Sequence, residues 1–308
     1  MLFAPGTRRL AEILHDSAEY LAQNGIENAR LNAERLLAHL LQVNRPHLYL
    51  DSEHDLTTSK LEQLANFLRR RARQEPLQHI LGETEFMSLP FKVSPAVLIP
   101  RPETEVLVEG VLKRCEQMFS PTTDVAILDV GTGSGCIAVS LAKYLKNAEV
   151  TALDISAEAL HAAAANAALN RVSRRIKFAN IDFFRKDIVN RLSAQFDVVV
   201  SNPPYVSVAD FDDLPAEVKH FEPTIALHDQ ADGLRFYRRI SEVARQLLKP
   251  VGFWALEVGT GQAPVVRDMM LKSGFARVKV NQDLNGIDRV LICDRDQEHR
   301  HQPFLWRK

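Results

Sequence analysis

The spacing of apolar residues changes along the chain and divides it into three parts. Through residues 1–75, apolar positions recur every three or four residues and predict a small N-terminal helical domain. Residues 76–99 alternate between apolar and polar positions, beginning at His79 and Leu81, and predict a β-hairpin linker. Residues 100–308 alternate between short buried-type strands and helices, a pattern that predicts an α/β domain with a parallel sheet.

The helix that precedes the linker has recognisable ends. Ser59 and Glu62 predict a capping box at its start. Its last turn is basic, with the cations Arg69, Arg70, Arg71 and Arg73. As a solvated terminus these cations complement the helix dipole; the alternative is a contact with an acidic partner or RNA.

A glycine-rich turn follows the first strand of the α/β domain, Val125–Val130. It consists of Gly131, Thr132, Gly133, Ser134 and Gly135 and runs into a helical pattern. Glycines there allow a tight turn and a close approach of the backbone to a ligand at the helix N-terminus. A dinucleotide-binding fingerprint requires glycine or alanine at the position of Cys136, so the turn departs from that motif.

Acidic residues end the next two strands. Asp154 is well placed to accept hydrogen bonds from both hydroxyls of a ribose, and Asp182 from an adenine amine. Phe183 offers an aromatic face to cover the adenine. The alternative for Asp154 is capping of the following helix, which begins near Ser156. Two acids at successive strand ends, after a glycine turn, favour nucleoside binding.

Asn202, Pro203, Pro204 and Tyr205 follow the fourth strand, Phe196–Ser201. In open α/β sheets, ligands bind beyond the carboxyl ends of the strands. The prolines make a stiff corner with two acceptors, the Asn202 side-chain oxygen and the Pro203 carbonyl. Two acceptors suit a planar –NH2 group, and Tyr205 adds a flat ring against which it packs. The alternative is a proline-rich turn after a core strand.

Together these motifs resemble S-adenosylmethionine-dependent amino-methyltransferases, and more closely the HemK/PrmC family of release factor glutamine methyltransferases. Five further segments carry the resemblance: Leu98–Glu105, Glu222–Leu227, Asp232–Leu234, Leu256–Gly259 and Asp288–Val290. The matching segments span roughly the last two-thirds of the chain in order. Phe183 departs from the tryptophan of some members.

The resemblance implies a class I S-adenosylmethionine-dependent methyltransferase fold, a doubly wound, mostly parallel seven-stranded sheet whose last pair includes an antiparallel strand. It implies methyl transfer from S-adenosyl-L-methionine, leaving S-adenosyl-L-homocysteine, to the glutamine N5 in the Gly-Gly-Gln loop of class I peptide chain release factors. The glycine turn, Asp154, Asp182, Phe183 and Asn202 would then bind the cofactor. Asn202, Pro203 and Tyr205 would be catalytic, and with Pro204 they would hold the substrate.

The segment Arg101–Glu105 has two interpretations. By resemblance it lies over the cofactor; from the sequence alone, Thr104 and the two glutamates are ordinary first-turn residues of a helix. Residues 206–231 are acidic and irregular, and we expect a substrate-facing flap. Its acids either meet a basic partner or solvate the loop.

The composition of the chain argues against several classes of protein, including duplex-DNA-binding, disulfide-stabilised and membrane proteins. The 308 residues carry a formal net charge of −1, and the pI is about 6.8. A near-neutral chain argues against a large footprint on duplex DNA, so we expect no stable DNA binding. Cys115, Cys136 and Cys293 are scattered and predict neither a disulfide framework nor a zinc site. Without an apolar run of membrane-spanning length or a signal-peptide core, we expect a soluble, cytoplasmic protein. We also expect it to be a monomer.

Two other functions fit the same holder for a planar –NH2 group. One is an N6-adenine nucleic-acid methyltransferase, because an exocyclic amine has the same donors; the charge and the lack of a basic, aromatic-rich insertion argue against it. The other is a nucleoside-binding scaffold that has lost catalysis. The intact Asn202 argues against that, since an inactive relative is free to lose it.

Overall fold

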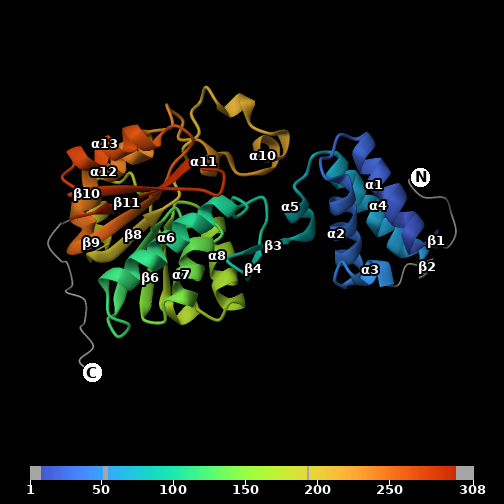
Figure 1. Ribbon diagram of the computed structural model, residues 1–308, viewed down its shortest axis with the longest axis horizontal. Helices are drawn as coiled ribbons and strands as arrows, with labels where there is room; N and C mark the ends of the chain where they lie inside the picture. Colours follow the sequence, from blue (N-terminus) through green and yellow to red (C-terminus); the bar gives the residue numbers. More distant parts are fainter. Residues whose placement is uncertain (1–7, 51–54, 193, 296–308) are drawn as a thin grey trace. The chain divides into compact units, whose positions relative to one another are not determined.

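The computed structural model describes residues 8–50, 55–192 and 194–295. The chain forms two compact units. One contains residues 1–83 together with 215–221, and the other contains residues 84–214 and 222–308. Figure 1 labels the helices and strands of both units.

The first unit is helical. Its elements are β1 (Arg8–Arg9), α1 (Leu10–Gln23), α2 (Ala29–Leu41), α3 (His47–Leu50), β2 (Asp55–Leu56), α4 (Thr58–Ala72), α5 (Leu77–Leu81) and α10 (Ala216–Phe221). Aliphatic side chains from α1, α2 and α4 form one buried core, as the helical spacing predicts. Two details differ from the prediction. The short strands β1 and β2 pair antiparallel, and Thr57, not Ser59, caps α4 by accepting a hydrogen bond from the Lys60 N–H.

The boundary after this unit lies later than residue 75. The expectation of extended chain at His79 and Leu81 is wrong, because both lie in helix α5. The helix follows Pro76 and ends at Gly82, whose φ of 74° is the left-handed conformation that glycine adopts readily at a helix end. The hairpin comes next, from β3 (Glu83–Phe86) to β4 (Leu89–Lys92).

The second unit contains the predicted sheet. Its remaining elements are α6 (Pro102–Met118), β5 (Val125–Val130), α7 (Cys136–Tyr144), β6 (Ala148–Asp154), α8 (Ala157–Leu169), η1 (Ser173–Arg175), β7 (Ile176–Asn180), α9 (Ile188–Leu192), β8 (Phe196–Ser201), η2 (Phe211–Asp213), α11 (Thr224–Leu227), α12 (Arg235–Leu247), β9 (Leu248–Glu257), α13 (Ala263–Lys272), β10 (Arg277–Gln282) and β11 (Asp288–Asp294). The seven sheet strands follow the order β10-β11-β9-β8-β5-β6-β7. Neighbours from β7 to β9 are parallel, while β11 is antiparallel to both β9 and β10. The predicted doubly wound, mostly parallel sheet is thus confirmed.

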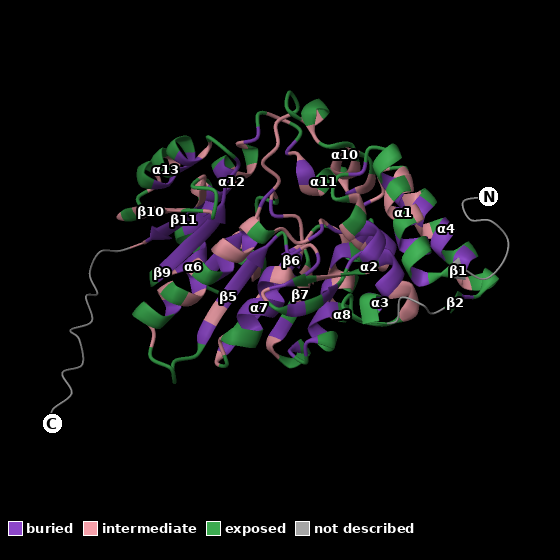
Figure 2. Ribbon diagram, turned by 45° about the vertical axis from the view of Figure 1, so that its right-hand side comes forward, coloured by how far each residue is buried: buried purple, intermediate pink, exposed green. Residues whose placement is uncertain are grey.

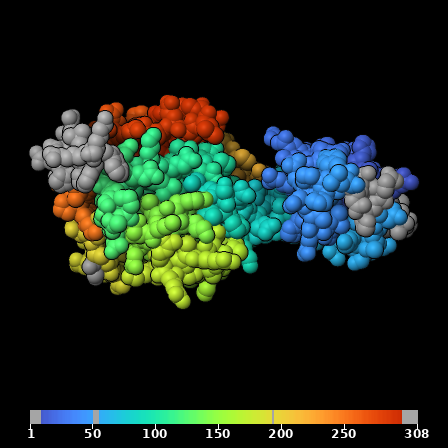
Figure 3. Space-filling view, turned by 60° about the horizontal axis from the view of Figure 1, so that its bottom comes forward, coloured from blue at the N-terminus to red at the C-terminus, as the bar shows by residue number. Residues whose placement is uncertain are grey.

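Helices cover both faces of the sheet. Helices α6, α7 and α8 and the hairpin pack on one face, and α9, α12 and α13 pack on the other. The central strands β5, β8, β9 and β11 are buried between these layers (Figure 2) because their alternate side chains enter the two cores. The edge strands β7 and β10 are more exposed. In Figure 3, the surface formed by the segments from α6 to α8 is drawn in green to yellow-green.

Residues 206–231 are more ordered than the expected irregular loop. They contain η2, α10 and α11, and a β-bridge joins Val206 to His228. Helix α10 belongs to the helical unit, where the Arg71 guanidinium lies 2.9 Å from the Glu217 carboxylate. Arg71, from the basic run, is itself buried and also donates to the Asn32 side-chain oxygen. The acid at 217 and this cation therefore serve the internal packing of one unit.

No helix among the described residues combines the length and the apolarity needed to cross a lipid bilayer.

Candidate active site

A cavity opens at the carboxyl ends of the parallel strands, beside the point where the chain reverses its direction across the sheet. The chain leaves β5 toward β6 and β7 on one side, and β8 and β9 lie on the other. Such a switch point leaves a crevice for ligands. Of the residues predicted to bind cofactor or substrate, Gly131, Gly133, Asp154, Asp182, Phe183, Asn202, Pro203 and Pro204 line the cavity.

The glycine turn needs glycine for two different reasons. Gly131, Gly133 and Gly135 have φ values of 74°, 55° and 79°, which side chains rarely adopt. A Cβ on Gly135 would also lie 2.9 Å from the Ala163 Cβ, so this residue permits close packing of the turn on α8. Gly131 and Gly133 face the cavity, whereas Gly135 does not line it.

Thr132 and Ser134 lie behind the turn and do not line the cavity. Both are buried, and the Thr132 hydroxyl donates to the Asp129 carboxylate at 2.7 Å. Burial raises the pKa of Asp129 to about 7. Thr132, Ser134 and Asp129 therefore support the glycine turn on the side away from the cavity, so the backbone of the turn is left to contact a ligand.

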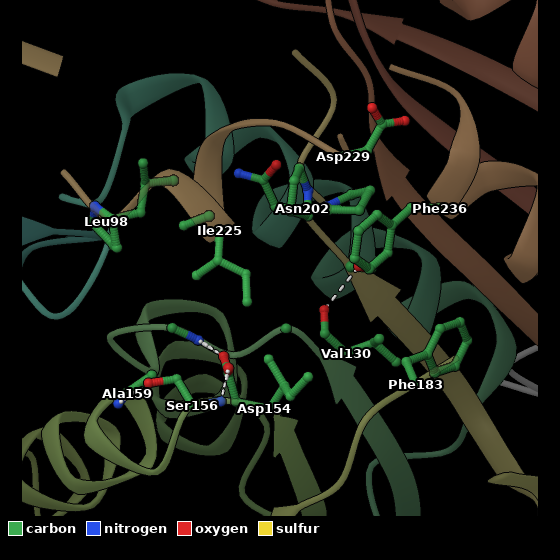
Figure 4. A pocket seen from close by; sticks show the side chains of 18 of the residues that line it. Leu98, Val130, Asp154, Ser156, Ala159, Phe183, Asn202, Ile225, Asp229 and Phe236 are labelled. Atoms are coloured by element: carbon green, nitrogen blue, oxygen red, sulfur yellow. Dashed lines mark hydrogen bonds between the residues drawn. The ribbon is translucent and has the colours of Figure 1, made fainter. Parts of the chain in front are cut away.

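Asp154 combines the two roles considered for it. One carboxylate oxygen accepts from the Gly133 N–H and the other from the Ser156 N–H, each at 2.9 Å (Figure 4). A carboxylate has about four acceptor positions, so capacity remains for a ligand in the cavity. The acid therefore holds the glycine turn against the start of α8 and still faces the cavity.

We expect Asp154→Ala to weaken S-adenosylmethionine binding by about 1.5–3 kcal/mol, the cost of losing hydrogen bonds to a charged group. Titration calorimetry on the purified variant measures this. Glu158→Ala is the matched control, because Glu158 is an exposed acid in the first turn of α8, the helix that follows Asp154, and does not line the cavity. Equal affinities of the folded Asp154 variant and the wild type would remove Asp154 from the ribose site.

Aromatic side chains close another side of the cavity. Phe183 is 5% exposed and packs into the core while lining the cavity, and Phe184 and Phe236 line it as well. The Phe184 and Phe236 rings meet edge to face at 4.8 Å, and the Arg235 guanidinium lies 4.5 Å from the Phe184 ring centre. Neither Phe184 nor Phe236 was predicted to line the site from its sequence position. The sequence signal that could have identified Phe184 is its position directly after Phe183.

Asn202 is held by a residue far away in the sequence. Its Nδ2 donates to the Thr104 Oγ1 at 3.1 Å, and Thr104 is 2% exposed in the first turn of α6. With the nitrogen engaged, Oδ1 is the end of the amide left to accept a hydrogen bond from a ligand. Thr104 therefore does more than begin a helix, because its hydroxyl oxygen also orients the Asn202 amide.

Tyr205 lies behind the corner and does not line the cavity. Its hydroxyl points to the Glu257 Oε1 at 3.5 Å. Burial raises the pKa of Tyr205, and the nearby Glu257 adds to this shift. The phenol is thus neutral at any physiological pH and serves as a packing and hydrogen-bonding group.

Two segments that carry the resemblance, Leu98–Glu105 and Glu222–Leu227, are joined by side-chain contacts. Arg101 forms an ion pair with Glu222, whose other oxygen accepts from the Ile99 N–H at 3.2 Å. Glu222 is buried, so this contact fixes the entry to α6 against the end of the acidic segment. Asp229 fixes the start of α12 in a similar way, because its Oδ2 accepts a hydrogen bond from the Arg235 backbone nitrogen at 2.8 Å.

Two protein-family models match the chain. The PrmC N-terminal domain family matches residues 12–82, and the methyltransferase small domain family matches residues 104–217. The hMettl16 catalytic domain, solved in complex with a 3′UTR hairpin, has a TM-score of 0.54 at 18% identity over 76% of this chain and 83% of that chain. That likeness shows the fold alone.

Two curated relatives extend over nearly the whole chain. A release factor glutamine methyltransferase from Geobacter sulfurreducens is 42% identical, covering 92% of this chain and 95% of that protein. One from Chlorobaculum tepidum is 41% identical, with 92% and 96% covered. With the family models matching both units and relatives aligned along almost their full length, the chain belongs to the release factor glutamine methyltransferase family.

Proposed function

We propose that this protein methylates the side-chain amide nitrogen, N5, of the glutamine in the Gly-Gly-Gln loop of class I peptide chain release factors. It is a methyltransferase that uses S-adenosyl-L-methionine. The observation that carries the proposal is the fixed amide of Asn202, whose nitrogen is held by Thr104 at 3.1 Å while its oxygen is left for a donor. The names of the full-length relatives support the same substrate.

The lining of the cavity fits the methyl donor. Gly131 and Gly133 present backbone without side chains, and a Cβ at either would meet nothing within 4 Å. We assign Asp154 to the ribose and Asp182 to the base, with Phe183 and Phe184 packing beside the adenine. When bound, S-adenosylmethionine supplies a methyl group already activated by its sulfonium. The chain supplies binding, orientation and exclusion of water.

The corner at Asn202 and Pro203 then holds the substrate amide. An amide nitrogen is a weak nucleophile because its lone pair is delocalised into the carbonyl. Accepting both N–H bonds, at the Asn202 side-chain oxygen and the Pro203 carbonyl, pins the nitrogen and raises its electron density. Transfer then depends on near-attack geometry more than on a strong base, and the proton leaves to water after the methyl arrives.

Labelled methyl transfer to a purified release factor tests the proposal. We expect the label on the glutamine of the Gly-Gly-Gln loop, located by mass spectrometry of the digested product. A release factor with that glutamine changed to asparagine is the matched control and should take up no label. Labelling of adenine in DNA, with none on the release factor, would contradict the assignment.

We also propose a role for the helical unit. None of its described residues lines the cavity, and its α10 derives from the acidic segment that follows Tyr205. We assign it the task of gripping the folded release factor, with the acidic segment facing the substrate. On this proposal the enzyme works as a cytoplasmic monomer and forms no stable complex with DNA.

A further inference from the structure

The last residue of β9, Glu257, is a buried acid behind the corner that holds Asn202. It is 1% exposed, and its Oε2 accepts no hydrogen bond of standard geometry from a described residue. Its other oxygen lies 3.5 Å from the Tyr205 hydroxyl, a long contact. A buried carboxylate with such poor compensation costs stability, so a functional reason for it is expected.

Thr104 connects this acid to Asn202. The Thr104 oxygen accepts from the Asn202 Nδ2 at 3.1 Å, which leaves its own hydrogen to be donated elsewhere. The Thr104 hydroxyl is a donor near the Glu257 carboxyl, and it opposes the effect of burial on the pKa of that acid. The three side chains therefore follow one another from β9 through α6 to the end of β8.

No cation among the described residues neutralises Glu257 directly. Arg289 faces it from β11 and lowers its pKa, but the Arg289 Nε is paired with the Asp283 carboxylate at 3.1 Å. The other titratable groups that face it are Glu103 from α6, Cys136 from α7, Tyr205 after β8 and Tyr237 from α12. None of these carries a positive charge.

We propose that Glu257 is a positioning residue for methyl transfer, holding the Asn202 amide through Thr104 with its oxygen toward the substrate nitrogen. This inference rests on the proposed function. An ionised Glu257 polarises the Thr104 O–H and, through it, the Asn202 N–H, so the Asn202 oxygen becomes a stronger acceptor. That matters most in the transition state, where the substrate nitrogen uses its lone pair to bond the methyl carbon and becomes positive. The electron pair of the breaking carbon–sulfur bond stays on sulfur, and the nitrogen proton leaves to water.

A dependence on pH follows. Burial raises the pKa of Glu257 from its usual value to about 7, so the carboxylate protonates near neutral pH. The ionised form is the one that accepts from Thr104, and turnover should therefore fall as the pH drops through about 7. Asp129 titrates in the same range and must be distinguished from Glu257.

Kinetics on release factor test this role of Glu257. We expect Glu257→Gln to lower kcat about 10–100-fold at pH 8, as for other residues that orient a group in the active site. KM and the affinity for S-adenosylmethionine should stay within a few-fold, and the acid limb of the pH profile should vanish. Thr104→Val should match this loss, Thr104→Ser should restore most activity, and the double variant Thr104→Val/Glu257→Gln should be no worse than either. Unchanged kcat and an unchanged acid limb in Glu257→Gln would overturn the inference, as would losses of cofactor affinity and thermal stability that fully account for the lower rate.

A second measurement needs no substrate and therefore separates this inference from the proposed function. In 15N-labelled enzyme, the side-chain NH2 resonances of Asn202 should shift with pH around 7, and Glu257→Gln should abolish the shift. Asp129→Asn should leave it in place, because Asp129 contacts Thr132 and not Thr104. A titration of Asn202 that persists in Glu257→Gln refutes this role of Glu257, even if release factor proves not to be the substrate.

Discussion

Replacing Asn202 by alanine is expected to lower turnover roughly 10²–10³-fold, the usual effect of removing a positioned polar group from an active site. Affinity for S-adenosylmethionine should remain nearly unchanged, because the glycine turn and Asp154 stay in place. The physical reason is the loss of one of the two acceptors that fix the substrate nitrogen, while the cavity keeps its lining. Single-turnover kinetics on release factor and calorimetry with the cofactor measure the two effects separately.

Asn285→Ala is the control for this experiment. Asn285 is an exposed asparagine in the turn between β10 and β11, and only its backbone N–H makes a hydrogen bond. Its variant should keep full turnover. If the Asn202 variant also turns over within a few-fold of the wild type, Asn202 is only a turn residue and the amide-holder mechanism fails.

Intact release factor is expected to be methylated on the order of 10²-fold faster, in kcat/KM, than a short Gly-Gly-Gln peptide. A single glutamine side chain offers little surface, so most of the binding energy must come from contacts remote from the reacting amide. Such energy positions the nitrogen as well as capturing the substrate. Removing residues 1–82 should erase most of the preference and leave cofactor affinity intact.

That deletion also takes away the partner of Glu217, and Glu217→Ala is the matched control. It removes the 2.9 Å contact with the Arg71 guanidinium while leaving the bond from Arg71 to Asn32 in place. If Glu217→Ala alone abolishes the preference, placement of α10 accounts for it and not the gripping surface. Equal rates on peptide and protein with the full-length enzyme refute the gripping role.

Local patterns were sufficient to predict much of the α/β unit. Each buried strand carries its own apolar run, so Val125–Val130 and Phe196–Ser201 could be delimited without knowledge of their neighbours. The residues that follow those strands lie at the same edge because the strands are parallel, and this brings Gly131 and Asn202 to one cavity. The alternation of apolar and polar residues at His79 wrongly predicted extended chain, because the five residues between Pro76 and Gly82 form a helix.

Long-range partners could be found only in the folded chain. Thr104 and Asn202 are 98 residues apart, and Arg71 and Glu217 are 146 residues apart. In the sequence, Thr104 has the features of a helix start and Glu257 those of the end of a buried strand. Periodicity depends on which face of an element meets the solvent, and that is a local property. Which side chain satisfies a buried donor depends on strand order and helix packing, so the roles proposed for Thr104 and Glu257 arise only when α6, β8 and β9 come together.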